Sequence, residues 1–217
     1  GTQVTAPRLG AGMIDPVPGA ELGEIIDVAR EGDAIVLVSE TRRGILATRY
    51  DLEMRQTGQP SFLTPYEQSA AVTSDGERLW LATQEFYVPG TPREGRHAVS
   101  LVELAPSAPP MRVRGARVTD PPVGFKDIVQ DAAYDSGSDS VLALYGRTKS
   151  GSPNSGDIRL AVVDATTLDP LRDVKVADAD GLDDPTSIAV TARDGIALVF
   201  WRTGGETNHH LARVDVR

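Results

Sequence analysis

The sequence predicts an all-β protein built from four copies of one antiparallel unit. Three observations support this fold class. The order strand, tight turn, apolar strand, loop, strand recurs four times along the chain. The second strand of each copy is apolar almost throughout, which is typical of a sheet that is buried on both faces. No stretch of ten residues shows a convincing helical period, so little helix is expected.

The last copy, at 184–217, shows the unit most clearly. A first strand at 185–191 leads through Asp194 and Gly195 into the apolar stretch 196–201, and a polar loop precedes a third strand at 210–217. An Asp-Gly pair favours a tight turn because glycine adopts a positive φ without steric cost. This order of residues therefore predicts a three-stranded antiparallel meander.

The three earlier copies follow the same order and add a more polar fourth strand, at 54–57, 111–118 and 171–176. An acidic residue ends the third strand of every copy, at Asp51, Glu103, Asp164 and Asp215. These residues are roughly 50 to 60 positions apart, close to the ~40–50-residue period of propeller blades. A two-sheet sandwich would instead show alternating polarity in its central strands.

These patterns predict a single-domain, four-bladed β-propeller with four-stranded antiparallel blades at about 24–57, 69–118, 128–176 and 186–217. The last copy ends before a fourth strand. Within residues 2–8, Gln3, Val4 and Thr5 alternate in polarity, and Pro7 is tolerated on an edge strand. We therefore expect this N-terminal strand to close the last blade and protect its edge. Five irregular blades, or half of an eight-bladed dimer, are the alternatives.

The Asp-Gly turn, the apolar second strand and the Val-Asp ending of the third strand resemble bacterial β-propeller repeat proteins over essentially the whole chain. The resemblance implies an architecture and not a particular activity, because one fold hosts many functions. The bias of the basic residues towards arginine, with lysine only at 126, 149 and 175, is also associated with a bacterial source.

The net charge, the apolar content and the lack of cysteine argue against several classes of binding partner and chemistry. The net charge is −9, so a nucleic-acid partner, which requires a basic surface, is not expected. No apolar run reaches the ~18 residues of a membrane span, and membrane insertion is not expected either. The chain contains no cysteine, which excludes disulfides and thiolate catalysis. We expect an exported protein, either secreted or periplasmic.

The longest predicted loops join second to third strands and one blade to the next, and all of them lie at one end of a propeller. Loops on a rigid scaffold commonly carry binding residues, so this long-loop end is the predicted ligand site. The candidate ligand-binding residues are Phe86, Tyr87, Arg93, Arg96, His97, Arg147, Arg202 and His209.

An acidic turn at 178–184 is the candidate metal site. It places Asp178, Asp180 and Asp184 around Gly181, and carboxylate oxygens are the ligands that Ca²⁺ prefers. The order Asp-x-Asp-Gly-x-x-Asp resembles the calcium loop of integrin-type propeller repeats, although Val176 occupies the position of the first ligand. A solvated acidic turn without metal is the alternative interpretation.

The sequence contains no nucleophile elbow, phosphate-binding glycine loop or paired-histidine zinc helix. We therefore predict a non-enzymatic binding module that recognises a protein or a glycan through its long-loop end, with a homodimer as a candidate assembly. The alternative is a metal-dependent hydrolase or lyase with its site at the mouth of the central channel.

Overall fold

The computed structural model describes residues 24–41, 44–64, 68–86, 97–105, 110–149, 152–179, 188–202 and 209–217. These residues form fifteen β-strands and no helix, which confirms the all-β prediction. Within these ranges, no helix is long and apolar enough to cross a membrane.

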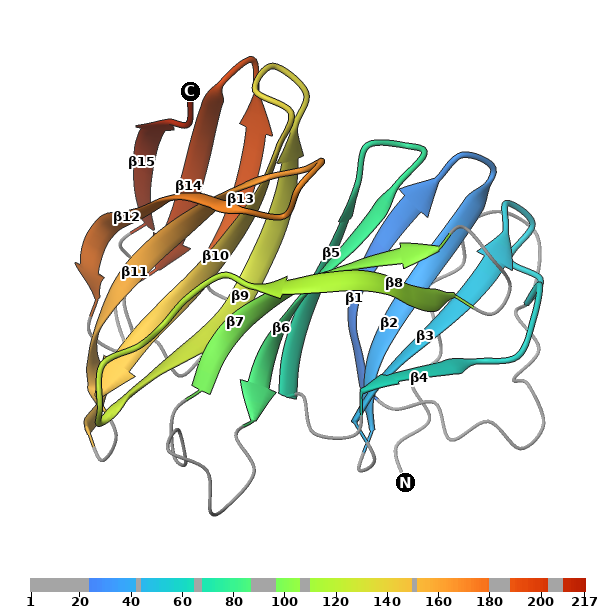
Figure 1. The fold of residues 1–217 in the computed structure, drawn as a ribbon, viewed down its shortest axis with the longest axis horizontal. Helices are drawn as coiled ribbons and strands as arrows, with labels where there is room; N and C mark the ends of the chain where they lie inside the picture. Colours follow the sequence, from blue (N-terminus) through green and yellow to red (C-terminus); the bar gives the residue numbers. More distant parts are fainter. Residues whose placement is uncertain are drawn as a thin grey trace.

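The first sheet is an antiparallel meander of four strands in sequence order (Figure 1). Its strands are β1 (Glu24–Glu31), β2 (Ala34–Thr41), β3 (Gly44–Asp51) and β4 (Ser61–Thr64). Gly32 forms the turn between β1 and β2 with a φ of 53°. This left-handed conformation favours glycine over residues with a Cβ.

Two further four-stranded meanders follow. The second meander contains β5 (Gln68–Ser74), β6 (Leu79–Phe86), β7 (His97–Ala105) and β8 (Met111–Arg117). The third meander contains β9 (Phe125–Asp135), β10 (Ser140–Lys149), β11 (Ser152–Asp164) and β12 (Pro170–Ala179). One parallel bridge between His97 and Lys126 joins β7 to β9, so the two meanders share one sheet.

The last sheet has three described strands: β13 (Ile188–Arg193), β14 (Ile196–Arg202) and β15 (His209–Asp215). Gly195 turns β13 into β14 with a φ of 80°. Among the described strands, β15 pairs with β14 alone, so its other edge has no described partner.

The innermost strands organise the four meanders into an arc. β1 lies beside β5, β5 beside β9, and β9 beside β13, with the first and last sheets at opposite ends (Figure 1). No described strand joins these two end sheets. The closed four-bladed ring therefore stays a prediction, because the expected closing strand at 2–8 lies outside the described residues.

Apolar clusters between successive sheets explain the apolar second strands. On β10, Val141 and Ala143 pack in a cluster with the second meander. The alternate residues Leu142 and Leu144 pack in a cluster with the last sheet. Because successive side chains of a strand point to opposite faces, a strand buried on both faces needs apolar residues at every position.

Two partly buried carboxylates connect neighbouring innermost strands. Asp27 on β1 accepts a hydrogen bond from the amide of Val72 on β5 at 2.6 Å. Asp131 on β9 accepts one from the amide of Val190 on β13 at 2.7 Å. Each carboxylate also accepts the amide of the residue that follows it. These bonds fix the position of one meander relative to the next.

Candidate functional site

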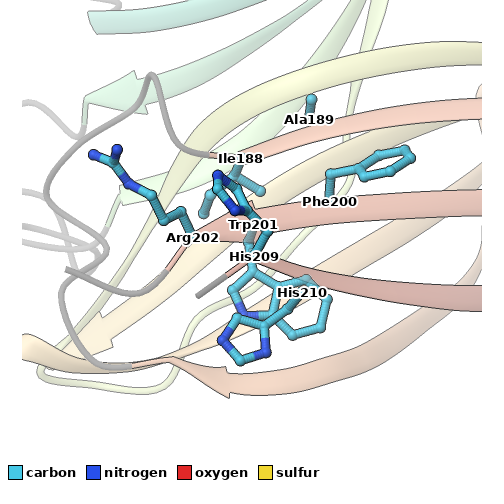
Figure 2. A pocket seen from close by; sticks show the side chains of 7 residues that line it. All are labelled: Ile188, Ala189, Phe200, Trp201, Arg202, His209 and His210. Atoms are coloured by element: carbon cyan, nitrogen blue, oxygen red, sulfur yellow. The ribbon is translucent and has the colours of Figure 1, made fainter. Parts of the chain in front are cut away.

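A pocket of about 320 Å³ lies at the long-loop end of the last sheet, where β14 ends and β15 begins. Figure 2 shows its lining, which comprises Ile188, Ala189, Phe200, Trp201, Arg202, His209 and His210. Volumes of this size accommodate small ligands or single groups of larger ones. The pocket is the candidate binding site of the described residues.

The pairing of β14 with β15 positions the lining side chains. Trp201 pairs with His210, and their rings stack with centroids 5.1 Å apart. Trp201 packs against the cluster shared with the third meander, so these two rings lie on the inner face of the sheet. The Nε2 atom of His210 is buried and has no hydrogen-bond partner among the described residues.

Arg202 and His209 form the next pair of residues across β14 and β15, and both are exposed. The alternation of a strand turns them towards the opposite face from Trp201 and His210. The structure therefore brings together two of the residues that the sequence predicted to bind a ligand. It adds Trp201 and His210, whose stacking depends on the register of β14 against β15.

Arg147 is another predicted ligand-binding residue, and its guanidinium is hydrogen-bonded to a carboxylate of the same chain. Its guanidinium forms two hydrogen bonds to Asp127, Nε to Oδ1 at 2.7 Å and Nη2 to Oδ2 at 2.9 Å. Asp127 is 0% exposed. This pair raises the pKa of Arg147, chiefly through the hydrogen bond to Asp127. The arginine therefore neutralises a buried carboxylate of its own chain.

The same network continues across the third meander. Tyr145 donates its hydroxyl proton to Asp173 at 2.7 Å, and Arg159 donates to the same carboxylate at 3.1 Å. Burial raises the pKa of the Tyr145 phenol, and the nearby Asp127 charge adds to this effect. Sequence reasoning missed this network, although polar residues at the alternate positions 145 and 147 of an apolar strand are a usable signal.

The remaining predicted ligand residues lie away from the pocket lining or outside the described residues. His97 begins β7 beside Lys126 on β9, and burial, together with the Lys126 charge, lowers its pKa. Phe86 ends β6 with its backbone paired to His97. The residues outside the described ranges are Tyr87, Arg93 and Arg96.

The candidate calcium turn is described only at its start. Asp178 is exposed, and its carboxylate accepts a hydrogen bond from Lys175 at 2.6 Å, which lowers the pKa of Asp178. Asp180 and Asp184 lie outside the described residues. Within the described ranges, no three histidine or carboxylate side chains are grouped so as to hold a metal. Calcium binding stays a prediction.

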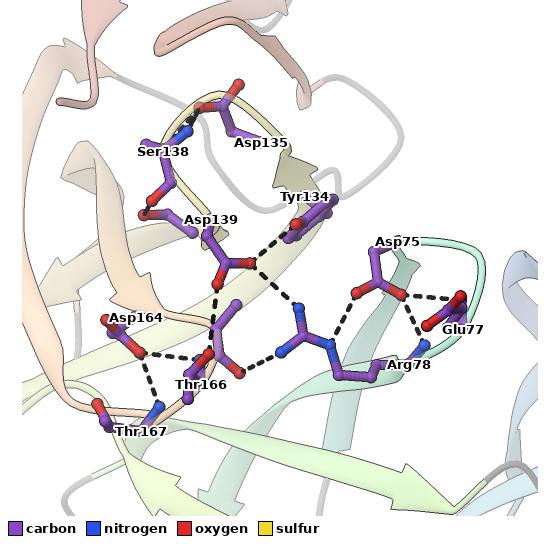
Figure 3. A network of polar contacts seen from close by, with 12 residues as sticks. Asp75, Glu77, Arg78, Tyr134, Asp135, Ser138, Asp139, Asp164, Thr166 and Thr167 are labelled. Carbon is purple, nitrogen blue, oxygen red and sulfur yellow. Dashed lines mark hydrogen bonds and ion pairs between the residues drawn. The ribbon is translucent and has the colours of Figure 1, made fainter.

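A second polar network lies at the opposite, short-turn end and joins the second and third meanders (Figure 3). Arg78 pairs with Asp75 at 2.8 Å and with Asp139 at 3.1 Å. Its guanidinium lies 4.8 Å from the ring centroid of Trp80, which stacks on Tyr134. Tyr134 donates to Asp139 at 2.8 Å. These contacts cross-link two turns, so the network stabilises the packing of the meanders.

Asp131, on the innermost strand β9, has a strongly shifted pKa. Burial raises the pKa of Asp131 to about 6, and the charge of Asp27 contributes in the same direction. Hydrogen bonds from the amides of Val190 and Ala132 lower it. The charge of Asp27, on β1, is the smallest of these effects. A carboxyl group with a pKa near 6 can hold a proton close to neutral pH.

Comparisons with known proteins show the fold alone. No protein-family model and no curated protein matches the sequence. The chain is similar in structure to the hydrazine synthase of Kuenenia stuttgartiensis, with a TM-score of 0.55 and 16% identity over 94% of this chain and 50% of that one. It is similar to a subtype N11 neuraminidase-like protein of a flat-faced bat influenza A virus, with a TM-score of 0.53 and 10% identity over 88% and 50%.

A third similar structure is the GH43 protein BlXynB of Bacillus licheniformis, with a TM-score of 0.51 and 11% identity over 88% of this chain and 39% of that one. The chain thus spans half or less of the length of these proteins. Their folds are β-propeller-like, and the described fold of this chain is all-β and propeller-like. At such low identity the likeness carries no activity across.

Proposed function

We propose that this chain is a binding module that recognises a carboxylate-bearing glycan at the pocket between the ends of β14 and β15. The observation that carries the proposal is the arrangement of Arg202 and His209 as neighbours at the mouth of the pocket, on the same face of the sheet as Phe200. Both residues are exposed, so their donor groups are accessible to a ligand.

The chemistry of the lining favours an acidic ligand with an apolar face. An arginine presents two parallel donors to a carboxylate, and a protonated histidine adds a further donor. Phe200, on the same face as Arg202, supplies flat apolar surface, against which a sugar ring or another ring can pack. A glycan that contains uronic acids combines both properties.

The described lining holds no carboxyl group of the kind that glycoside hydrolysis requires. Most glycoside hydrolases require a pair of carboxyl groups on either side of the scissile bond. The described residues that line the pocket include neither Asp nor Glu. The described lining is therefore suited to holding a glycan.

Isothermal titration with oligogalacturonate tests this function. A charge-assisted hydrogen bond contributes about 1.5–3 kcal/mol, so Arg202→Ala is expected to weaken binding about tenfold to a hundredfold. Arg193→Ala is the matched control, because Arg193 is also an exposed arginine of the last sheet but does not line the pocket. Equal losses in both variants, or no binding by the unmodified chain, would refute the proposal.

A second candidate is a metal-dependent hydrolase or lyase at the mouth of the central channel. The pKa of about 6 at Asp131, with Asp27 nearby, favours this reading. Both carboxylates accept two backbone amides each, which supports a structural role instead. Assays on aryl glycosides with and without Ca²⁺ separate the catalytic role from the structural one. If the site is catalytic, the variant Asp131→Asn should abolish the activity.

Glycan recognition belongs with an exported protein, and secretion or periplasmic location is part of this proposal. The finer fold prediction belongs here as well. Residues 2–8 would add a fourth strand to the free edge of β15, which would bring the last sheet to the strand number of the other meanders. Closure of a four-bladed ring by one chain predicts a monomer in solution.

A further inference from the structure

Two buried hydroxyl groups lie next to each other on the second meander. Thr83 on β6 is 0% exposed and Ser100 on β7 is 1% exposed. The two residues are paired directly across the antiparallel strands. Neither Thr83 Oγ1 nor Ser100 Oγ has a hydrogen-bond partner among the described residues. Such a hydroxyl is costly, because folding removes it from water without replacing its hydrogen bonds.

Both hydroxyls face the first sheet. Leu81, two residues before Thr83, packs in the apolar cluster between the first and second meanders. Val102, two residues after Ser100, packs in the same cluster. Because side chains alternate along a strand, the two hydroxyls project to this same face. They lie one step closer to the long-loop end of β6 and β7 than the leucine and the valine do.

The apolar cluster offers these hydroxyls no polar partner from the first sheet. On that side it includes Val38 and Ile45, which are both 0% exposed and have no polar side-chain atom. The buried hydroxyl of Thr119, by contrast, accepts a hydrogen bond from the amide of Val99 at 2.9 Å. Buried polar groups that the protein leaves unpaired are commonly bridged by ordered water.

We infer that Thr83 and Ser100 together bind one internal water molecule at the junction of the first and second meanders. Residues paired directly across an antiparallel ladder have Cβ atoms about 4.5–5.5 Å apart, a spacing that a single water molecule can bridge. A hydroxyl both donates and accepts hydrogen bonds, so each of the two side chains is a partner for this water.

Water suits this site better than a larger or a charged ligand. Neither hydroxyl is reachable from solvent, so the ligand must fit between two packed sheets. Two neutral hydroxyls do not compensate the loss of hydration of a buried ion. A buried water makes about two to four hydrogen bonds, and the two hydroxyls supply that minimum.

The enclosure of the site links the water to a motion of the sheets. Since both side chains are shut off from solvent, the water can exchange only when the first and second meanders separate locally. Its exchange rate therefore reports the opening of this junction. The site is separate from the pocket at β14 and β15, and the inference stands whether or not that pocket binds a glycan.

Magnetic relaxation dispersion of the water oxygen tests the inference on the full chain, because it counts water molecules that stay bound longer than the protein takes to tumble. Thr83→Val keeps the shape of the side chain and removes its hydroxyl, and Ser100→Ala removes the other hydroxyl. Each variant should lose the dispersion amplitude of one water molecule. Thr191→Val is the matched control and should keep the amplitude of the parent, because Thr191 is an exposed threonine of β13.

Urea denaturation gives a second readout. With a bound water, Thr83→Val should lower the urea midpoint by more than Thr191→Val does, since the water and Ser100 lose a partner. A dry site gives the opposite sign, because replacing an unpaired buried hydroxyl by a methyl group removes a desolvation cost. A midpoint of Thr83→Val that does not fall, or an unchanged dispersion amplitude in either variant, would overturn the inference.

Discussion

The buried carboxyl group of Asp131 should make stability depend on pH in an unusual direction. Its pKa is about 6 in the folded protein, against an ordinary value of 3.8. Between these two values the folded state binds more protons than the unfolded state, so the free energy of unfolding falls as pH rises. The contribution of Asp131 is fully present below about pH 3.8 and is lost by about pH 6.

The magnitude follows from the shift. A difference of about two pKa units, at 1.36 kcal/mol per unit, corresponds to roughly 3 kcal/mol between pH 4 and pH 7. Asp131→Asn removes the titration but keeps an amide of similar shape, whose oxygen can still accept the hydrogen bond from Val190. The variant should match the parent near pH 4 and exceed it by about 2–3 kcal/mol near pH 7.

Urea denaturation at constant ionic strength, followed by the fluorescence of Trp80 and Trp201, measures this difference. Other carboxyl groups, such as that of Asp135, have a lowered pKa in the folded protein. Their protonation at low pH destabilises parent and variant equally. The difference between parent and variant therefore isolates Asp131. Asp169→Asn, at an exposed turn, is the control. A difference that stays constant from pH 4 to pH 7 would refute the reasoning.

Three further predictions concern single groups. Asp127→Ala leaves the half-buried guanidinium of Arg147 without its partner and should cost about 3–5 kcal/mol of stability in thermal unfolding; a loss under 1 kcal/mol would contradict the buried pair. Leu144→Ala should cost about 2–5 kcal/mol in urea, whereas Leu171→Ala at an exposed position should stay within about 0.5 kcal/mol. Calcium bound by the 178–184 turn should raise the unfolding midpoint, because the ligand binds only the folded state. Lys175→Met, which releases Asp178, should tighten that binding, and a midpoint unchanged by EDTA would remove the calcium proposal.

Local sequence patterns predicted only part of the candidate site. Arg202 and His209 were predictable because a polar loop flanked by two apolar strands places its ends together across a hairpin. Arg147 was predicted for the same reason, yet it faces Asp127, and the turn chemistry of its own strand does not reveal that partner. Trp201 and His210 were not predicted because their stacking depends on the register of β14 against β15.

The sequence by itself determined the strand order, the apolar second strands and the tight turns at Gly32 and Gly195, since periodicity and positive φ are local properties. Only the tertiary structure decided which carboxylates bridge neighbouring strands. Asp131 reaches Val190 across 59 residues of sequence. It also decided which rings stack across β14 and β15, as Trp201 does on His210. Both depend on the register and packing of distant segments, which no pattern along a single strand encodes.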